Sequence, residues 1–466
     1  MRTTLALTAV LAIACGSNNK PPHNGDVDAP VQGAVDAPEV HYIDGTPDAC
    51  VGLECMKVDC KGQGIGTTRL SGTVYAPNGT LPLYGVNVYV PNSDPGAITD
   101  GVSCNRCDDK LPGNPVSKTT TDEYGHFQLD DVPVVDNLPV VVTVGKWRRQ
   151  LTVSTVTQCM DNPLDVAATR LPKNHTEGDM PQIAISTGGC DALECLVHKL
   201  GIDDSEFTNG SGAGKVHLYA GTDGANKFDT SFANQGNFGD SKSWWSDVNQ
   251  LKKYDIVMFS CECEQHMETK PPKALQALYD YSNLGGRVFM SHWQNGWIEN
   301  APQPWPSVAN FDNNQDTPFE ALDTINQSFD RGKAMYLWLD GPEVKALDAS
   351  KKLPVNDPRD SAHTINNYTG TNTPRADDFV DLGGCSDCSL ATAVQDFQFT
   401  TPNDKPESER CGKVVFSDMH VASGSSSSTS EGFPKGCSTD PTMTPQEKAL
   451  AFIFFDIASC VGPIVN

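Results

Sequence analysis

The sequence predicts a multidomain protein in which an all-β sandwich is followed by an α/β domain with a doubly wound sheet. The first observation is the length, since 466 residues exceed what one ordinary domain holds. The second is a change of pattern along the chain. Short alternating strands separated by Gly, Pro and Asn turns fill 67–157, whereas apolar strands and amphipathic helices alternate over 178–466.

The first 15 residues have the pattern of an export signal. Arg2 supplies a positive charge, and the apolar stretch 5–14 is too short to span a bilayer. The run 11–15 resembles the lipobox of bacterial lipoproteins. That resemblance implies a lipid anchor on Cys15 and a place in the cell envelope, and Gly16 after it favours the outer membrane of a Gram-negative bacterium. An ordinary signal peptide cleaved nearby, which would release a soluble exported protein, is the alternative.

Two segments separate this signal from the first predicted domain. Residues 16–48 are rich in Pro, Gly and Asp and repeat Asp-Ala-Pro, a composition that cannot bury a core, so we expect a disordered acidic tether. Residues 49–66 contain Cys50, Cys55 and Cys60, a local cluster of cysteines that we expect to attach the tether to the first domain.

The formal net charge of −25 argues against one class of partner. Binding to nucleic acid depends on clustered Lys and Arg, and the chain has 59 acidic residues against 34 basic ones. The one basic patch, at 146–149, is interpreted as an exposed strand end rather than a ligand site. We therefore expect no nucleic acid partner. The lipid anchor would provide a membrane contact, and a protein or carbohydrate ligand stays open.

Cysteine usage also indicates export. Removing Cys15 from the sixteen cysteines leaves fifteen, which in an oxidising compartment predicts disulfides and one remaining thiol. The disulfide candidates, with connectivity left open, are Cys104, Cys107, Cys190, Cys195, Cys385 and Cys388. Cys104/Cys107 and Cys385/Cys388 are C-x-x-C pairs that together would supply four zinc ligands, but they lie in different predicted domains and exported thiols oxidise.

Four strand patterns predict the first domain, at 70–75, 86–90, 125–129 and 139–144. Gly72-x-Val74, the Pro-Leu-x-Gly-Val-x-Val-x-Val run at 82–90 and the Thr-Asp-x-x-Gly-x-Phe-x-Leu run at 121–129 resemble the carboxypeptidase regulatory-like domain, a transthyretin-like β-sandwich. In that family the turn Asp bonds local amides and the Gly supplies a positive φ. The resemblance implies a fold and no chemistry of its own.

Alternating strands and helices predict the second domain. Strand patterns lie at 183–187, 216–220, 255–260, 287–291 and 411–417. Helix patterns lie at 193–200, 240–251, 271–283 and 444–457. The last helix has a capping box, Thr444-x-x-Glu447, with Pro445 at its first position. Leu450, Ile453, Phe454 and Ile457 predict one apolar stripe on it that faces the core. Residues 295–400 show no clear pattern.

The order of these elements, with Gly285-Gly286 before the strand that ends at His292, resembles the class I glutamine amidotransferase-like fold and its trehalose-utilisation-like branch, a flavodoxin-like arrangement. In amidotransferases that strand ends at a nucleophilic cysteine, and a later strand ends in a His followed two residues on by a Glu. Here His292 stands at the cysteine position and His420 is followed by Ala422. The resemblance therefore implies the fold without glutamine hydrolysis.

Three residues remain candidates for chemistry. His292, Asp418 and His420 are expected at the carboxyl ends of neighbouring strands, where open α/β sheets bind ligands. Two imidazoles and a carboxylate suit a divalent metal ion with open positions. Further candidates for the same rim, just after the strand at 255–260, are Glu262, Glu264 and His266. Either Glu262 or Asp418 would act as the base. The interpretation that we favour from the sequence is that these residues hydrogen-bond crevice loops without catalysis.

Two other patterns are less specific. Asp312-x-Asn314-x-Asp316 begins like a calcium loop but lacks the turn glycine and the bidentate Glu. A sugar-binding platform or plain core packing would account for five tryptophans, Trp244, Trp245, Trp293, Trp297 and Trp305.

The function expected from the sequence is that of a non-catalytic cell-envelope lipoprotein that binds or displays a ligand. The alternative is a metal-dependent hydrolase acting on a small or carbohydrate-derived substrate. A divalent metal is the one cofactor that the residues suggest.

Overall fold

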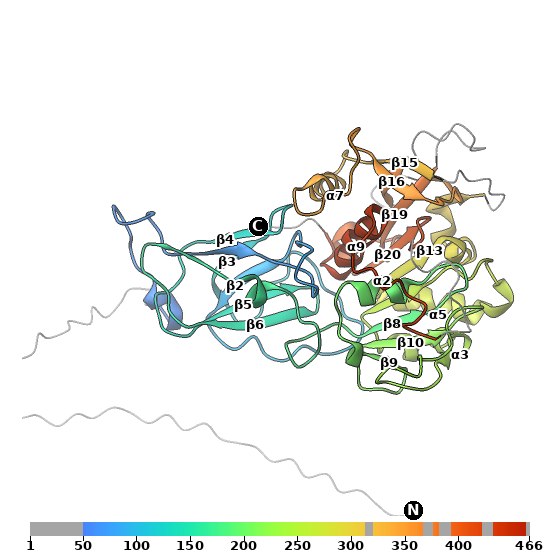
Figure 1. Cartoon of the computed structure of the whole chain (residues 1–466), viewed down its shortest axis with the longest axis horizontal. Coiled ribbons are helices and arrows are strands. Elements are labelled where there is room, and N and C mark those ends of the chain that lie inside the picture. The colour runs from blue at the N-terminus through green and yellow to red at the C-terminus, as the bar shows by residue number, and fades with distance from the viewer. Residues whose placement is uncertain (1–49, 313–319, 367–375, 382–392, 422–431, 463–466) are drawn as a thin grey trace, which may run out of the picture. The chain divides into compact units, whose positions relative to one another are not determined.

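The computed structural model describes residues 50–312, 320–366, 376–381, 393–421 and 432–462. The predictions for the signal, Cys15, the tether, Cys385, Cys388, Ala422 and the calcium-like loop after Asp312 therefore lie outside the described residues. The chain is multidomain, mostly sheet with a few helices, and partly of α/β character (Figure 1). No described helix is long and apolar enough to cross a membrane.

The N-terminal part of the described chain forms two small sheets. The three-stranded sheet has the order β4 (His126–Leu129), β1 (Arg69–Thr73), β7 (Asp161–Pro163). The four-stranded sheet has the order β3 (Pro115–Thr120), β2 (Asn87–Pro91), β5 (Leu138–Val144), β6 (Trp147–Val153). Leu70 and Phe127 from the first sheet share a core with Val88 and Val140 from the second, because alternate residues of each strand point inward. A short helix, α1 (Val166–Thr169), and the 3₁₀ turn η1 (Gly52–Met56) flank these sheets.

The turn predicted at 121–129 is confirmed in detail. One Asp122 carboxylate oxygen accepts hydrogen bonds from the backbone amides of Tyr124, at 2.9 Å, and His126, at 2.8 Å. Gly125 has a φ of 77°, and a Cβ there would lie 2.9 Å from the backbone nitrogen of Leu83. Glycine is thus required both by the backbone conformation and by the close approach of the neighbouring chain.

The C-terminal part contains a mixed sheet of eleven strands among the described residues. Ten of the strands follow the order β11-β10-β8-β12-β13-β20-β19-β18-β15-β16. The eleventh, β9, pairs with β10. The parallel strands are β8 (Ile183–Ser186), β9 (Phe207–Asn209), β10 (Val216–Ala220), β11 (Gly239–Asp240), β12 (Ile256–Phe259), β13 (Arg287–Ser291) and β20 (Gly412–Ser417). The antiparallel extension, whose strands the sequence did not predict, is β19 (Val394–Thr401), β18 (Ala376–Asp381), β15 (Glu320–Ile325) and β16 (Leu353–Asn356).

Helices cover both faces of the parallel strands. Alternate strand residues such as Ile185 and Met258 share a core with α2 (Leu193–Lys199) and α9 (Pro445–Ala458). Their neighbours, such as Ala184 and Val257, pack in a second core with the helices α3 (Ser241–Trp245), α4 (Val248–Leu251), α5 (Pro272–Asn283) and α6 (Gly296–Glu299). Burial on both faces explains why these strands read as continuous apolar runs. The remaining elements are α7 (Asp330–Asp340), the small pair β14 (Ala309–Phe311) and β17 (Ala362–Ile365), and the 3₁₀ turns η2 to η6 (Asp204–Glu206, Met267–Thr269, His292–Asn295, Trp305–Ser307, Glu407–Glu409).

Two helix predictions need correction. The single helix expected over 240–251 is divided into α3 and α4, because the Asp247 side chain accepts a hydrogen bond from the Asn249 amide and starts a second helix. Helix α9 has the predicted capping box, but it is buried on all sides rather than along one stripe. The Phe452 ring lies 6.2 Å from the Tyr84 ring and the Phe455 ring lies 6.3 Å from the Trp147 ring, so residues of the N-terminal part cover the face that would otherwise meet solvent.

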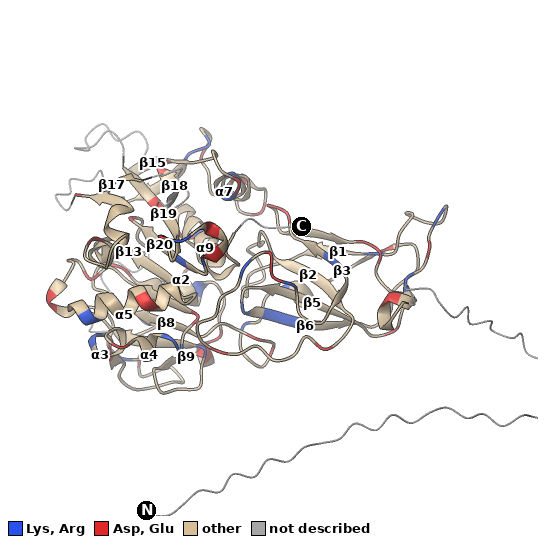
Figure 2. Ribbon diagram, turned by 180° about the vertical axis from the view of Figure 1, so that it is seen from behind, with Lys and Arg blue, Asp and Glu red and all other residues tan. Residues whose placement is uncertain are grey.

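The basic patch at 146–149 is not the exposed strand end that the sequence suggested. Figure 2 shows basic residues along β6. Arg148 is 4% exposed and pairs with Asp179 at 2.7 Å, while Lys146 pairs with Asp255 at 2.5 Å. These two side chains form ion pairs that connect β6 and the turn before it to neighbouring segments. Acidic and basic residues are otherwise dispersed over many elements of the described chain (Figure 2).

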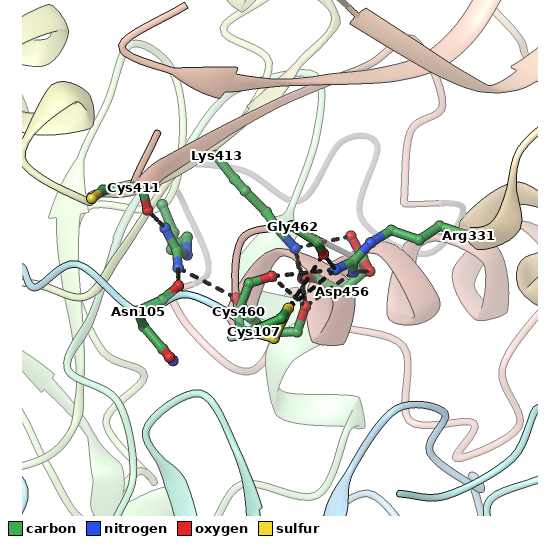
Figure 3. Close-up of polar contacts among 10 residues, drawn as sticks. Asn105, Cys107, Arg331, Cys411, Lys413, Asp456, Cys460 and Gly462 are labelled. Atoms are coloured by element: carbon green, nitrogen blue, oxygen red, sulfur yellow. Dashed lines mark hydrogen bonds and ion pairs between the residues drawn. A yellow bond between two sulfur atoms is a disulfide. The ribbon is translucent and has the colours of Figure 1, made fainter. Parts of the chain in front are cut away.

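Two disulfides connect the segment between β2 and β3 to the large sheet and to the end of α9. They are Cys104–Cys411 and Cys107–Cys460. Beside the Cys107–Cys460 bridge lies a largely buried network in which Lys413 and Arg331 both contact Asp456 (Figure 3). Gly285, which lies between α5 and β13, has a φ of 112°, and a Cβ there would lie 2.5 Å from the Ser103 carbonyl oxygen of this same segment.

Candidate metal centre

Three potential metal ligands come from the carboxyl ends of three adjacent parallel strands. Cys261 follows β12 after one intervening residue, His292 follows β13 directly, and His420 lies three residues beyond β20. Since β12 pairs with β13 and β13 pairs with β20, all three side chains reach the same edge of the sheet. This is the edge at which open α/β sheets place their ligands.

The ligand atoms are close enough to share one ion. Cys261 Sγ lies 3.3 Å from His292 Nδ1, which lies 3.2 Å from His420 Nε2, and all three atoms fall within 4.8 Å of one another. Ligands of a tetrahedral zinc ion, at about 2.0–2.3 Å from the metal, are separated from each other by roughly 3.3–3.6 Å. The donor set and these two distances therefore suit a zinc-class ion. The relative exposures of Cys261, His292 and His420 are 0%, 2% and 6%.

The backbone at His292 is unusual for a residue with a side chain. Its φ is 42°, in the left-handed region, where it turns the chain from β13 into the 3₁₀ turn η4. A non-glycine residue held there costs on the order of 1–3 kcal/mol, and such conformations cluster at functional sites. The turn directs the imidazole toward His420, whose ring lies 5.0 Å away at 75°, and also places Trp293 5.0 Å from the His292 ring.

Burial determines the protonation of the site without an ion. Desolvation raises the pKa of the Cys261 thiol to about 12 and lowers the pKa of His420. The thiol is therefore neutral at physiological pH and is a poor nucleophile by itself. A coordinated divalent cation would reverse this preference, because a metal-bound thiol loses its proton.

Asp418, predicted as a ligand with the two histidines, lies elsewhere. Its carboxylate accepts hydrogen bonds from the Ser361 hydroxyl and, at 3.0 Å, from the Ala362 amide. Burial raises its pKa to about 7. Its own amide continues the ladder from β20 to β19 by donating to the Gln395 carbonyl, which turns the side chain away from the histidines. The structure thus brings His292 and His420 together and places the Asp418 carboxylate outside their group.

The other predicted rim residues do not join the group either. Glu262 is fully buried and forms an ion pair of 2.7 Å with the equally buried Lys270, so it is not available as a base at the metal centre. It also accepts a hydrogen bond from the Thr222 amide at 2.6 Å. His266 contacts Glu268 at 2.9 Å, and Glu264 is exposed.

Cysteine pairing reveals why the sequence did not point to Cys261. Besides the two bridges described above, Cys190 pairs with Cys263, Cys195 with Cys437, Cys60 with Cys159 and Cys50 with Cys55. Cys104 and Cys107 are thus in disulfides and not in a zinc site. Cys261 is the free thiol of the described residues. The signal in the sequence was the odd number of cysteines left after Cys15, which predicts one thiol without a disulfide partner.

The tryptophans pack mostly in the core. Trp244, Trp245, Trp297 and Trp305 are each at most 3% exposed. Trp293 alone of the five is partly exposed, and it lies beside His292. The sugar-binding platform is therefore wrong as a five-residue surface, and the alternative of core packing holds for four of them.

Glu194, in the first turn of α2, leads to a pH prediction. It is 4% exposed, its Oε2 atom has no hydrogen-bond partner, and burial raises its pKa from 4.5 to about 8. The folded state therefore binds a proton that the unfolded chain releases, so stability falls as the pH rises from about 4.5 to about 8, by up to about 1.4 kcal/mol per pH unit. Glu194→Gln is expected to remove this pH dependence. The unfolding free energy of the variant, measured in urea, should therefore rise relative to that of the wild type between pH 5 and pH 8.

Glu177→Gln is the matched control for that measurement. A hydrogen bond with Arg170 lowers the pKa of Glu177 to about 2, so its contribution is constant above the unfolded value and is lost only in acid. Its difference from the wild type should not change between pH 6 and pH 8. A pH-independent difference for Glu194→Gln as well would contradict the assignment.

Comparison with known proteins finds little similarity. No family model and no curated protein matches the chain. Among solved structures, a putative ThuA-like protein from Bacteroides uniformis is 13% identical, covers 59% of this chain and 90% of its own, and has a TM-score of 0.30. A cohesin–X-dockerin complex from Acetivibrio cellulolyticus is 15% identical over 31% of this chain and 78% of its own, with a TM-score of 0.16.

Proposed function

We propose that this chain is an exported cell-envelope metalloprotein that holds a zinc-class ion between Cys261, His292 and His420. The observation that carries the proposal is the convergence of one sulfur and two imidazole nitrogens within 4.8 Å from three separate strand ends. A thiolate with two imidazoles favours zinc or copper over magnesium and calcium, which prefer oxygen ligands. The pairing of twelve cysteines in six disulfides among the described residues supports an oxidising compartment.

The proposal includes the finer fold and location inferred from the sequence. These are a lipid anchor at Cys15 in the outer membrane, a regulatory-like β-sandwich at 67–157, and an amidotransferase-like α/β domain at 178–466. The parallel order of β10, β8, β12, β13 and β20 and the sharp turn at His292 support the last of these. The amidotransferase thiol would then be replaced by an imidazole, and a thiol from the neighbouring strand end would face it.

Metal analysis of the purified mature chain tests the proposal. We expect about one equivalent of Zn²⁺ per chain, and a Co²⁺-loaded protein with a thiolate-to-cobalt absorption band. The double variant His292→Ala with His420→Ala should lose stoichiometric binding, and Cys261→Ser should lose the thiolate band. His266→Ala is the control, since this histidine contacts Glu268 outside the group. A wild-type chain that binds no stoichiometric metal would contradict the proposal.

A second candidate, metal-dependent hydrolysis of a small or carbohydrate-derived substrate, has one observation in its favour. The described residues supply three ligands, and zinc sites with three protein ligands are those that bind a water molecule in the fourth position. Such an ion supplies a Lewis acid and an activated water. Trp293, partly exposed beside His292, would contact a sugar ring. Bound metal without turnover on model glycosides and esters would support the non-catalytic binding or display role instead.

A further inference from the structure

We propose that Asp191 is the positioning residue of the metal centre: its carboxylate holds the two histidine-bearing loops at ligand spacing and supplies the negative charge that the site needs. This inference rests on the metal site proposed above. The Asp191 carboxylate hydrogen-bonds to residues that lie beside the histidine ligands in the chain, so it acts on the ligands through these neighbours.

The contacts of Asp191 point to the backbone neighbours of both histidines. Its Oδ2 atom accepts a hydrogen bond of 2.5 Å from the hydroxyl of Ser291, which directly precedes His292. Its Oδ1 atom accepts one of 2.8 Å from the amide of Val421, which directly follows His420. One carboxylate therefore joins the ends of β13 and β20 at the positions where the two imidazoles leave the sheet.

The same loop also contacts the third ligand. The Cys190 amide donates to the Cys261 carbonyl at 3.0 Å, and the Cys190 side chain is bonded to Cys263, two residues beyond Cys261. Residues 190–191 thus touch the chain next to all three ligands. Asp191 has no exposed surface, and a third hydrogen bond, from the Ala192 amide at 2.9 Å, fixes its orientation. A carboxylate held this rigidly keeps the ligand atoms together before an ion arrives.

Charge balance favours the same assignment. Two neutral imidazoles, one thiolate and one divalent ion together carry a charge of about +1, which is costly in a buried place without a counterion. The groups around the site leave Asp191 as that counterion. Burial raises the pKa of Glu194 to about 8, so this neighbouring carboxyl is mostly neutral at pH 7, and Asp357 is already paired with Arg359 at 2.7 Å.

Asp191→Asn tests the role, because it keeps the shape but replaces one accepting oxygen by an amide and removes the charge. We expect the Zn²⁺ dissociation constant of the full mature chain, measured by chelator competition, to rise by about 10- to 100-fold. We also expect the cobalt absorption spectrum to change, since the ligand geometry changes. Ser291→Ala, which removes only one hydrogen bond and leaves the carboxylate, should weaken Zn²⁺ binding in the same direction by a smaller factor.

Glu206→Gln is the matched control for a merely structural effect. Glu206 is also fully buried and accepts three hydrogen bonds, from the His175 amide at 2.9 Å, the Lys215 amide at 2.8 Å and the His175 ring at 2.6 Å, but it lies outside the metal group. The Glu206→Gln variant should have a lower melting temperature and an unchanged Zn²⁺ affinity. If Asp191→Asn and Ser291→Ala behave in that way too, the positioning role is overturned while the metal site stands. A wild-type chain that binds no Zn²⁺ overturns both.

Discussion

Asp456→Asn is expected to lower the free energy of unfolding by about 3–5 kcal/mol, because it leaves the buried Lys413 and the partly buried Arg331 without their carboxylate. Arg331 and Lys413 both contact this side chain, and the side chains of Lys413 and Asp456 are only 2% and 4% exposed. Burial alone would raise the pKa of Asp456, but the two cations outweigh it and lower the pKa. The measurement is urea unfolding at pH 7 with the disulfides intact.

The rest of the network does not replace the lost charge (Figure 3). Lys413 also donates to the Asp456 carbonyl at 2.7 Å and to the Ser459 hydroxyl at 3.0 Å, and Arg331 donates to the Gly462 carbonyl at 2.9 Å. These acceptors are neutral dipoles at the end of α9, which favour a cation but do not balance it. Asp340→Asn is the control, since Asp340 pairs with the half-exposed Lys351 at the surface and should matter little. Equal losses in both variants would contradict the assigned importance of burial.

Removing the Cys107–Cys460 bridge by a double substitution to serine is expected to lower the unfolding free energy by about 4 kcal/mol. The two cysteines are 353 residues apart, but Cys104–Cys411 already closes most of that loop. Cys107 lies three positions after Cys104, and Cys460 lies 49 positions after Cys411, so the second bridge closes a loop of about 52 residues. The entropy that it removes from the unfolded chain corresponds to that shorter loop.

The Cys50–Cys55 bridge offers the comparison within the same chain. Its cysteines are five residues apart, and the chain-entropy relation predicts a loss of about 2 kcal/mol when both become serine. The two double variants should therefore differ by roughly 2 kcal/mol in urea unfolding under oxidising conditions. If the long-range bridge contributed no more than the local one, the constraint between the N-terminal sheets and the large sheet would have to come from packing alone.

The strands and helices with strong local signals were predictable from the sequence. The continuous apolar runs that became β8, β12 and β13, the Thr444 capping box and the Thr-Asp-x-x-Gly turn all depend on neighbours within a few residues. The antiparallel strands β15, β16, β18 and β19 were not predicted. Their sequences contain buried polar residues such as Asp323, Gln395 and Asp396, whose acceptability depends on what packs against them.

The candidate site was predictable only in part, for a related reason. His292 and His420 could be placed at one edge of the sheet because the ends of parallel strands meet there. The structure places the Asp418 carboxylate beside Ser361 and Ala362 instead, because the direction of a side chain two residues before His420 depends on the pairing with β19. Cys261 was missed, because among sixteen cysteines the one without a partner emerges only when all the others in the described chain are paired.

By itself, the sequence determined the alternation of β and α/β segments, the excess of cysteine expected of an exported chain, and the presence of two histidines after sheet strands. The tertiary structure alone decided which thiol faces those histidines, that Asp191 joins their loops, and that Asp456 balances the charges of Lys413 and Arg331. The physical reason is the distance along the sequence over which the deciding interactions act. Backbone conformation follows from local hydrogen bonds and sterics, whereas a shared metal site or a buried ion network forms between residues that are tens to hundreds of positions apart and meet only in the folded chain.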